Sequence, residues 1–219
     1  MSRLYSDVHR SLQTAFETRA LADRLEDMIV KSEFDEAAKA FVESRDFFFL
    51  TTVDHLGRPT VSYKGGAPGF IRLVDASTLV FPSYDGNGMY LSMGNLSCHP
   101  EIGILFIDFE KPFRLRVQGR AELILQGPEV EAFKDAEMAV KVRVTEMWMN
   151  CPRYIHRHKK LETSRYAPGV EPVTPFCEWK RIDGMQDVIR PAEKEKAAQL
   201  GTINIEEWMG KVVAGDADA

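Results

Sequence analysis

The chain has 219 residues, a length that allows one full domain with extensions or two small domains. Hydrophobic residues make up 44% and charged residues 28%, which is typical of a folded, water-soluble protein and disfavours collagen-like, disordered and membrane classes. The 28 Lys and Arg residues stand against 33 Asp and Glu, so the net charge is -5. We therefore expect no nucleic-acid partner, because phosphate-binding surfaces are usually basic.

The cysteines and the apolar segments indicate the compartment. Cys98, Cys151 and Cys177 are an odd number at wide spacing, which fits a reducing environment better than a disulfide framework. The first ten residues are polar, and no stretch approaches 18 uncharged apolar residues. We predict a cytoplasmic protein with neither a signal peptide nor a membrane-spanning helix.

Helical periodicity dominates the first 45 residues. Ser6 and Asp7 can cap a helix with an apolar stripe, and such a stripe must rest on another surface. A second helix is predicted over residues 35–44. The stripe of the first helix comprises Leu12, Phe16, Ala20, Leu25, Met28 and Ile29.

Beyond residue 46 the pattern becomes that of β-strands. Two β-rich runs flank the turn DHLG, and further strands are predicted at 70–74, 79–84, 102–109 and 113–125. A seventh strand over about 140–150 follows a helix-like interlude at 128–137. The fold class predicted is therefore mainly β with flanking helices (α+β), a barrel or a sandwich. In the strand 113–125 the predicted inward residues are Phe113, Leu115, Val117, Ala121, Leu123 and Leu125, and the outward ones are Arg114, Arg116, Gln118, Arg120 and Glu122.

The last 69 residues are less regular. The sequence predicts a short helix over 151–162, a loop rich in proline, a last short strand at 177–183 and surface helices at 191–201 and 205–211. Cys151, His156 and His158 could be zinc ligands, but on a helix the two histidines would point to different faces and no fourth ligand is evident. We predict no metal site.

Two loops could approach a ligand. Lys64 ends a strand and precedes the glycine-rich GGAPGF, although on local chemistry alone an ordinary solvent-exposed lysine before a flexible turn is the better explanation. The loop SYDGNGMYLSMGN turns at Gly86 and Gly88 and enters a predicted helix, so its N–H groups could hold a phosphate; a plain strand-to-helix turn is the alternative. The sequence contains no GxGxxG, GxxxxGK[ST], HExxH or GxSxG motif.

The order of these elements resembles a known family. The chain reads FFFLTTVDHLGRPTVSYKGGAPGF and then LVFPSYDGNGMYLSMGNLSCHPEIGILFIDFEKPFRLRVQGRAELI. This combination, over about residues 47–125, resembles the pyridoxamine 5'-phosphate oxidase-like family of FMN-binding split barrels. The resemblance implies a six- to seven-stranded antiparallel split barrel that forms a homodimer, with two FMN molecules in clefts between the chains. It also implies a helical extension at 1–45, an FMN-binding core at 46–150 and an extension at 151–219 that completes the cofactor and dimer region.

The resemblance also implies site residues. Where the family places basic phosphate ligands, this chain has Gly86, Asn87 and Gly88, so backbone N–H groups and Lys64 would have to substitute. Arg153 and His156 are expected on the substrate side. The residues expected to bind the cofactor are Ser62, Lys64, Asn87, Gly88, Asn95, Arg116, Gln118, Trp179 and Arg181.

The function implied is that of an FMN-dependent oxidoreductase acting on an unidentified small molecule. A flavin is itself the electron acceptor, so no side-chain nucleophile is required and no catalytic residue is assigned. Two alternatives stay open: a non-catalytic barrel that binds flavin or haem, and a cofactor-free barrel that dimerises through its charged face. Related barrels also bind a deazaflavin coenzyme.

Overall fold

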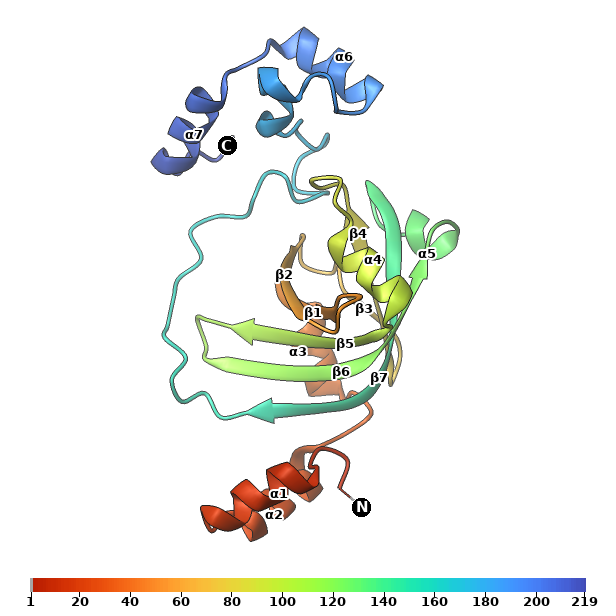
Figure 1. Cartoon of the computed structure of the whole chain (residues 1–219), viewed down its shortest axis with the longest axis vertical. Helices are drawn as coiled ribbons and strands as arrows, with labels where there is room; N and C mark the ends of the chain where they lie inside the picture. Colours follow the sequence, from red (N-terminus) through yellow and green to blue (C-terminus); the bar gives the residue numbers. More distant parts are fainter. Residues whose placement is uncertain (1) are drawn as a thin grey trace. The chain divides into compact units, whose positions relative to one another are not determined.

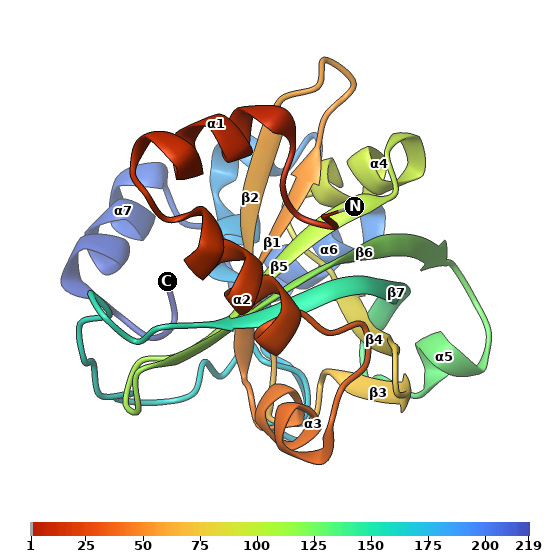
Figure 2. The same cartoon turned by 90° about the horizontal axis from the view of Figure 1, so that it is seen from below.

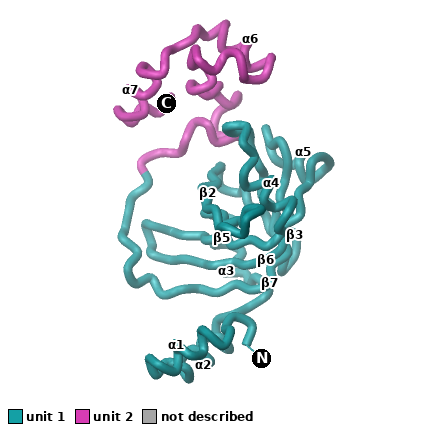
Figure 3. The backbone as a smooth tube through the Cα atoms, in the orientation of Figure 1, with its two compact units in different colours: residues 1–160 teal, residues 161–219 magenta. Residues whose placement is uncertain are grey.

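The computed structural model describes residues 2–219 and divides them into two compact units, with the boundary between Lys160 and Leu161 (Figure 3). The first unit holds three helices before the sheet, the sheet itself and two short helices within it. The second unit is entirely helical and irregular. The three segments expected from the sequence, 1–45, 46–150 and 151–219, stay a prediction. No helix among the described residues is long and apolar enough to cross a bilayer.

The N-terminal segment forms α1 (Asp7–Ala15) and α2 (Arg19–Ile29), which lie side by side (Figures 1 and 2). The prediction of one continuous helix was therefore wrong. Glu17 adopts a left-handed backbone with φ +56°, which interrupts the helical hydrogen-bond ladder. The predicted support for the apolar stripe is also missing, because neither helix buries a residue within the chain.

Helix α3 (Glu36–Glu43) confirms the second predicted helix. Its N-terminus is capped by the Asp35 side chain, which accepts a hydrogen bond from the Ala38 N–H at 2.9 Å. Ala38 and Val42 are buried on one face of the helix and join the main hydrophobic core. This helix therefore covers one end of the sheet with a conventional amphipathic face.

The sheet confirms the predicted fold class, mainly β with flanking helices. In the described chain it has seven strands in the order β2-β1-β5-β6-β7-β4-β3, and all paired neighbours are antiparallel (Figure 1). This arrangement is consistent with a split barrel. The strands are β1 (Phe47–Val53), β2 (Pro59–Gly65), β3 (Arg72–Asp75), β4 (Thr78–Tyr84), β5 (Glu101–Asp108), β6 (Phe113–Ile124) and β7 (Ala136–Asn150).

Alternation along the strands builds the core. In β1, Phe48 and Leu50 are fully buried, whereas their neighbours on the other face are half-buried. The predicted inward residues Leu115 and Val117 of β6 are buried as well. Leu125 is an exception: it is exposed because the strand ends at Ile124.

The helix between β6 and β7 is shorter than predicted. Only α5 (Pro128–Glu131) is helical, and β7 begins already at Ala136.

Between the paired strands β6 and β7 the register moves from Gln118 opposite Glu146 to Gly119 opposite Val144. This is a β-bulge, which increases the local twist of the sheet.

Residues 151–160, at the end of the first unit, form no helix, contrary to the prediction. Their backbone groups bond instead to the turn between β5 and β6: the His158 N–H donates to the Phe109 carbonyl at 3.1 Å, and the Lys160 N–H donates to Glu110 at 3.1 Å. The His158 and Phe109 rings also stack, with centroids 5.0 Å apart. Tertiary pairing thus replaces the local helical bonds.

The second unit contains two short 3-10 helices, η1 (Glu178–Arg181) and η2 (Asp183–Met185). A strand was predicted where η1 lies, and this was wrong, because its N–H groups bond three residues back within the turn. The predicted surface helices are confirmed as α6 (Pro191–Leu200) and α7 (Ile205–Ala214).

Candidate functional site

A hollow of about 250 Å³ opens between β2, the end of β4 and the start of α4 (Leu91–Cys98). Strand β2 contributes Ser62 and Lys64, and β4 contributes Ser83 and Tyr84. The remaining lining comes from residues 86–93, which form the glycine-rich loop and the first helical turn. Four residues predicted from the sequence to meet at one site, Ser62, Lys64, Asn87 and Gly88, therefore do lie around one hollow.

Lys64 is the charged group of this hollow. Its side chain is half-buried, and this burial lowers the pKa of its ammonium group. Among the described residues it has no hydrogen-bond or ion-pair partner, and the lining includes no carboxylate. A partly desolvated cation without a counter-charge favours the binding of an anion.

The loop before α4 is held by its own side chains. The side-chain oxygen Oδ1 of Asn87 accepts a hydrogen bond from the Met89 N–H at 3.1 Å, so the Asn87 side chain closes a turn within the loop. Gly88 has φ +74°, a conformation that favours glycine. Asn87 thus shapes the loop, and its carbonyl oxygen is already engaged there.

Helix α4, predicted from the sequence, starts at the hollow. The N–H groups of a first helical turn have no acceptor within the helix, and here Leu91, Ser92 and Met93 all line the hollow. The residue before them, Tyr90, has a left-handed backbone with φ +47°, and its hydroxyl donates to Glu137 at 2.8 Å. The positive end of the helix is therefore directed to the same space as Lys64.

Tyr84 adds a hydroxyl group that keeps its proton. Burial, reinforced by the negative charge of Asp135, raises its pKa to about 12, and Arg72 opposes this only partly. The phenol is therefore neutral at physiological pH and can donate a hydrogen bond. The hollow thus combines one cation, hydroxyl donors and helix N–H groups.

Asn95, predicted to bind the cofactor, does not line the hollow. It is buried on the other side of α4, where its amide nitrogen donates to the hydroxyls of Thr52 at 3.0 Å and Thr60 at 3.2 Å. Its observed contacts are those of a residue that fixes the helix onto β1 and β2. Its predicted role toward a cofactor stays a prediction.

Arg116 and Gln118 are exposed on the outer face of β6 and do not line the hollow. Arg116 lies opposite Leu105 of β5 and Trp148 of β7. These cross-strand neighbours place apolar side chains beside the polar and charged face that the sequence predicted for this strand. Whether this surface meets a cofactor stays a prediction.

The other predicted site residues lie outside the hollow. Arg153 and His156 are in the segment that follows β7 and have no secondary structure. Trp179 and Arg181 belong to the second unit, where Arg181 donates to the carbonyls of Gly201 at 2.7 Å and Leu200 at 3.1 Å. Within the described part of the chain no three His, Cys, Asp or Glu side chains gather as metal ligands.

Sequence reasoning missed four polar residues of the hollow: Ser83, Tyr84, Tyr90 and Ser92. A signal was available, because Ser83 and Tyr84 directly precede the glycine-rich turn and must end the strand beside it. Ser92 lies in the first turn of the helix that the same loop enters.

Comparison with known proteins gives the family. The family model described as pyridoxamine 5'-phosphate oxidase matches residues 34–151, more than half of the chain. The chain belongs to the pyridoxamine 5'-phosphate oxidase family. The matched region begins before α3 and ends at the close of β7, so it contains the whole sheet and the hollow. The resemblance seen in the sequence motifs is confirmed.

Three solved structures that match this member of the pyridoxamine 5'-phosphate oxidase family are each less than a fifth identical to it in sequence. HupZ of Group A Streptococcus is 19% identical, with 57% of this chain and 99% of that chain covered and a TM-score of 0.45. HutZ, the haem storage protein of Vibrio cholerae, is 19% identical over 53% and 94%, with a TM-score of 0.40. An FMN-binding protein of Syntrophomonas wolfei is 13% identical over 64% and 97%, with a TM-score of 0.41. None of the curated proteins compared matches the chain.

Proposed function

We propose that this member of the pyridoxamine 5'-phosphate oxidase family binds FMN and acts as an FMN-dependent oxidoreductase on a small molecule. The hollow beside Lys64 would hold the phosphate of the cofactor. The observation that carries this proposal is the half-buried Lys64 ammonium, which lacks an anionic partner and lies next to the N–H groups that begin α4.

The donor set fits a phosphate. A phosphate monoester carries roughly 1.5 to 2 negative charges at neutral pH. Lys64 supplies one full positive charge, and the first turn of α4 adds its partial positive charge. The Ser62 and Ser92 hydroxyls, 3.1 Å apart, can both turn toward an anion. This set replaces the basic side chains that the loop 85–90 lacks.

The volume of the hollow supports a cofactor site in which a second surface holds part of the FMN molecule. Pockets that enclose a whole drug-sized ligand measure roughly 300–1,000 Å³. At about 250 Å³ the hollow can take the phosphate end of FMN but not the whole molecule. We infer that the chain forms a homodimer with the remainder of the cofactor between the two copies.

The other predicted site residues enter the proposal here. Arg116 and Gln118, on the outer face of the sheet, would meet the cofactor or the second copy, as would Trp179 and Arg181 of the second unit. Arg153 and His156 would contact the small-molecule substrate.

FMN, when bound, supplies hydride and electron transfer. The residues of this chain would bind the cofactor and fix its orientation. Lys64 would compensate the phosphate charge, and the protonated Tyr84 hydroxyl would offer a neutral donor near the same anion. No side chain needs to act as a nucleophile.

Haem is the main competing cofactor. Iron in haem proteins is often held by an axial histidine. Among the described residues that line the hollow there is no histidine. This composition favours a phosphate-bearing cofactor at this position over haem.

The proposal is tested first by the absorption spectrum of the purified protein, since flavin, haem and an empty protein differ clearly. Titration with FMN and with riboflavin then isolates the phosphate contribution. Lys64→Met should raise the Kd for FMN about tenfold to hundredfold, because a charge-assisted hydrogen bond contributes roughly 1.5 to 3 kcal/mol. The Kd for riboflavin should not change. Lys111→Met, which removes an exposed lysine from the turn between β5 and β6, is the matched control.

Turnover is tested separately. Reduction of the bound flavin by NADH or NADPH and its reoxidation by an acceptor would support an oxidoreductase. Flavin that binds but is not reduced by either would favour the non-catalytic binding module. Equal affinity for FMN and riboflavin would contradict the phosphate site at Lys64.

A further inference from the structure

The segment that follows β7 concentrates positive charge. Residues 151–160 read CPRYIHRHKK and include four lysines and arginines, two histidines and no acidic residue, in a chain whose net charge is -5. Most of these side chains are exposed. A local charge opposite in sign to that of the whole chain indicates a surface that meets an anion.

The same segment is held to the turn between β5 and β6, which it passes in Figure 1. Besides the two backbone bonds described above, Arg157 Nε donates to the Glu110 carbonyl at 3.1 Å. At the start of the segment, Arg114 Nη2 of β6 donates to the Cys151 carbonyl at 3.2 Å. Cations from two distant parts of the sequence thus share one surface. We name this surface the cationic strip, which consists of Lys111, Arg114, Arg157 and Lys159.

The carboxylates that contact this turn and segment provide little compensation. Asp46 pairs with Lys160, and Asp108 pairs with Arg45, whose Nη1 lies 2.9 Å from Asp108 Oδ2. Glu110 accepts the Lys160 N–H and offsets one charge. Within the described chain no member of the strip has an ion pair, and its two arginines donate only to carbonyl oxygens. The strip therefore keeps an excess of positive charge.

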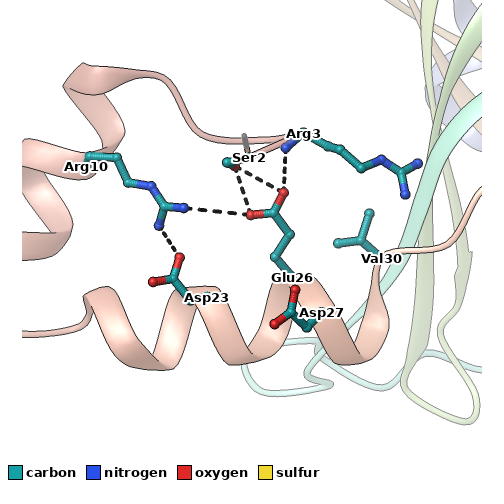
Figure 4. Close-up of a pocket in the computed structure, with 7 residues that line it drawn as sticks. All are labelled: Ser2, Arg3, Arg10, Asp23, Glu26, Asp27 and Val30. Atoms are coloured by element: carbon teal, nitrogen blue, oxygen red, sulfur yellow. Dashed lines mark hydrogen bonds and ion pairs between the residues drawn. The ribbon is translucent and has the colours of Figure 1, made fainter.

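The hollow of about 450 Å³ beside α1 and α2 is charged in a different way. Figure 4 shows that its cations and carboxylates face one another, with Arg10 Nη1 2.6 Å from Asp23 Oδ1. Glu26 accepts hydrogen bonds from the Ser2 hydroxyl at 2.8 Å and the Arg3 N–H at 2.6 Å. The charges of this hollow are balanced within the chain, whereas those of the strip are not.

A stack of four aromatic rings ends at the strip. The ring centroids are 5.4 Å apart for Tyr63 and Phe47, 6.0 Å for Phe47 and Phe109, and 5.0 Å for Phe109 and His158. Neighbouring ring planes are within 13° of parallel. His158 is exposed, and among the described residues Phe109 is the one ring that it contacts. The outer face of His158 is therefore open to a further planar ring.

Positive charge and a free ring face occur together at His158. This residue lies between Arg157 and Lys159 in the chain, so two cations adjoin the aromatic surface. Bases stack on aromatic side chains, and lysine and arginine neutralise phosphates. The combination fits a nucleotide, which has both a planar ring and negative charge.

Other anionic partners fit this surface less well. An acidic peptide would neutralise the cations but leave the ring face of His158 uncovered. Binding to an anionic membrane requires apolar side chains that enter it. Within residues 151–160 the one large hydrophobic side chain that is exposed is Tyr154, at 86%. This is too little apolar area for a membrane site.

The excess charge indicates how many phosphates the ligand carries. Four strip cations against the one carboxylate of Glu110 leave an excess of three. A single phosphate monoester carries roughly 1.5 to 2 negative charges and does not balance this. Two or more phosphate groups do.

We propose that the cationic strip and His158 form a binding site for a nucleotide with at least two phosphate groups. The base stacks on the free face of His158, and the phosphates lie against the strip. The site is separate from the hollow at Lys64, because Tyr63 at the far end of the stack points to the opposite face of β2 from Lys64. Two sources share this chemistry: a free nucleoside polyphosphate, and NADPH with its additional 2'-phosphate.

Calorimetric titration of the whole protein at low ionic strength tests the proposal with ATP, adenosine 2',5'-bisphosphate, adenosine and tripolyphosphate. One of the first two should bind at least tenfold more tightly than adenosine or tripolyphosphate, because only these two carry both a base and several phosphate charges. Tighter binding of ATP indicates a free polyphosphate, and tighter binding of the bisphosphate indicates NADPH. Equal binding of tripolyphosphate and ATP would overturn the proposal, as would the absence of binding or a capture by anionic vesicles that ATP does not reverse.

Variants separate the ring from the charges. His158→Ala should raise the Kd of the tighter nucleotide about tenfold without changing that of tripolyphosphate, and His158→Phe, which keeps a ring, should retain the affinity. Lys111→Gln/Lys159→Gln should raise both Kd values. Arg19→Gln/Arg24→Gln is the matched control, because it removes the same charge from exposed positions of α2. Equal effects of the two double variants would contradict the strip.

The FMN site is tested independently on the same samples. Lys64→Met should leave the Kd of the nucleotide unchanged, and saturating FMN should not displace it. Displacement by FMN would overturn the proposal, since the strip would then belong to the cofactor site. A protein that binds no FMN can still be titrated with the nucleotides, so failure of the cofactor proposal is distinguished from failure of this one.

Discussion

The hydroxyl oxygens of Ser62 and Ser92 lie 3.1 Å apart and connect strand β2 to the first turn of α4. Lys64 is two residues after Ser62, so it points to the same face of the strand. The alternation of a single strand therefore brings the one lysine of the hollow to the N-terminus of the helix. This pairing is the structural basis of the proposed phosphate site.

Gly88→Ala should weaken FMN binding more than riboflavin binding. The backbone of Gly88 has φ +74°, and alanine at such an angle costs about 1 kcal/mol and shifts the loop. A Cβ here would meet no atom within 4 Å, so the fold itself should persist. Gly57→Ala is the matched control, because Gly57 has φ +79° and equally open space but lies in the turn before β2. Fluorescence titration measures both; equal losses for the two flavins would contradict the prediction.

Asn95→Ala should destabilise the protein without changing the FMN affinity. The substitution removes the amide donor shared by the Thr52 and Thr60 hydroxyls, which then keep only each other at 2.8 Å, and this costs about 1–3 kcal/mol. Urea unfolding measures the loss, and the double variant Asn95→Ala/Thr52→Val should lose less than the sum of the single changes. A weaker FMN affinity at unchanged stability would restore the cofactor role that the sequence suggested for Asn95.

Asp54→Asn should destabilise the protein near neutral pH but much less in acid. Hydrogen bonds from the Arg58 side chain and from the Arg58 and Leu56 N–H groups lower the pKa of Asp54 from 3.8 to about 2. A lowered folded-state pKa stabilises the fold above the unfolded-state pKa, and this contribution is lost as the pH falls from about 4 to about 2. Urea unfolding of both proteins across this range checks the sign. A stability difference that grows on acidification would contradict it.

Gly119→Ala should lower the free energy of unfolding by about 1–3 kcal/mol. A Cβ at Gly119 would lie 2.4 Å from the Arg143 carbonyl oxygen, and backbone cannot move aside as a flexible side chain can. Gly103→Ala in β5 provides the comparison, because its Cβ would meet only Thr51 at an ordinary 3.6 Å. Thermal and urea unfolding should therefore separate the two variants clearly; similar stability would contradict this account of the bulge.

Alternation and turn chemistry explain why much of the sheet and four of the residues that line the hollow could be predicted. The Ser62 and Lys64 pair follows from the period of β2, and the turn at Gly86 and Gly88 marks where the chain enters α4. Asn95 lies apart from the hollow, and the helical pattern gave no signal for this. It is two residues from the buried Met93, which turns it roughly 200° away, so helical phase alone does not place it against Thr52 and Thr60.

The rest depended on interactions that local patterns do not encode. Nothing in the residues around Glu17 requires a left-handed backbone, so the break between α1 and α2 could not be predicted. The segment after β7 was predicted to be helical, but its N–H groups bond to the distant Phe109 and Glu110. Tertiary hydrogen bonds there outweigh the helical propensity of the segment.

The bulge in β7 also determines where the N-terminal segment attaches. Thr145 is the extra residue, with no partner in the register between Gln118 opposite Glu146 and Gly119 opposite Val144. Arg3 donates to its carbonyl. Deleting Thr145 would remove this acceptor and restore an even ladder, in which the buried Val144 and Met147, now three positions apart, would be two positions apart and follow the regular strand alternation. One inserted residue thus ties the phase of the strand to the anchoring of a segment more than a hundred positions earlier in the chain.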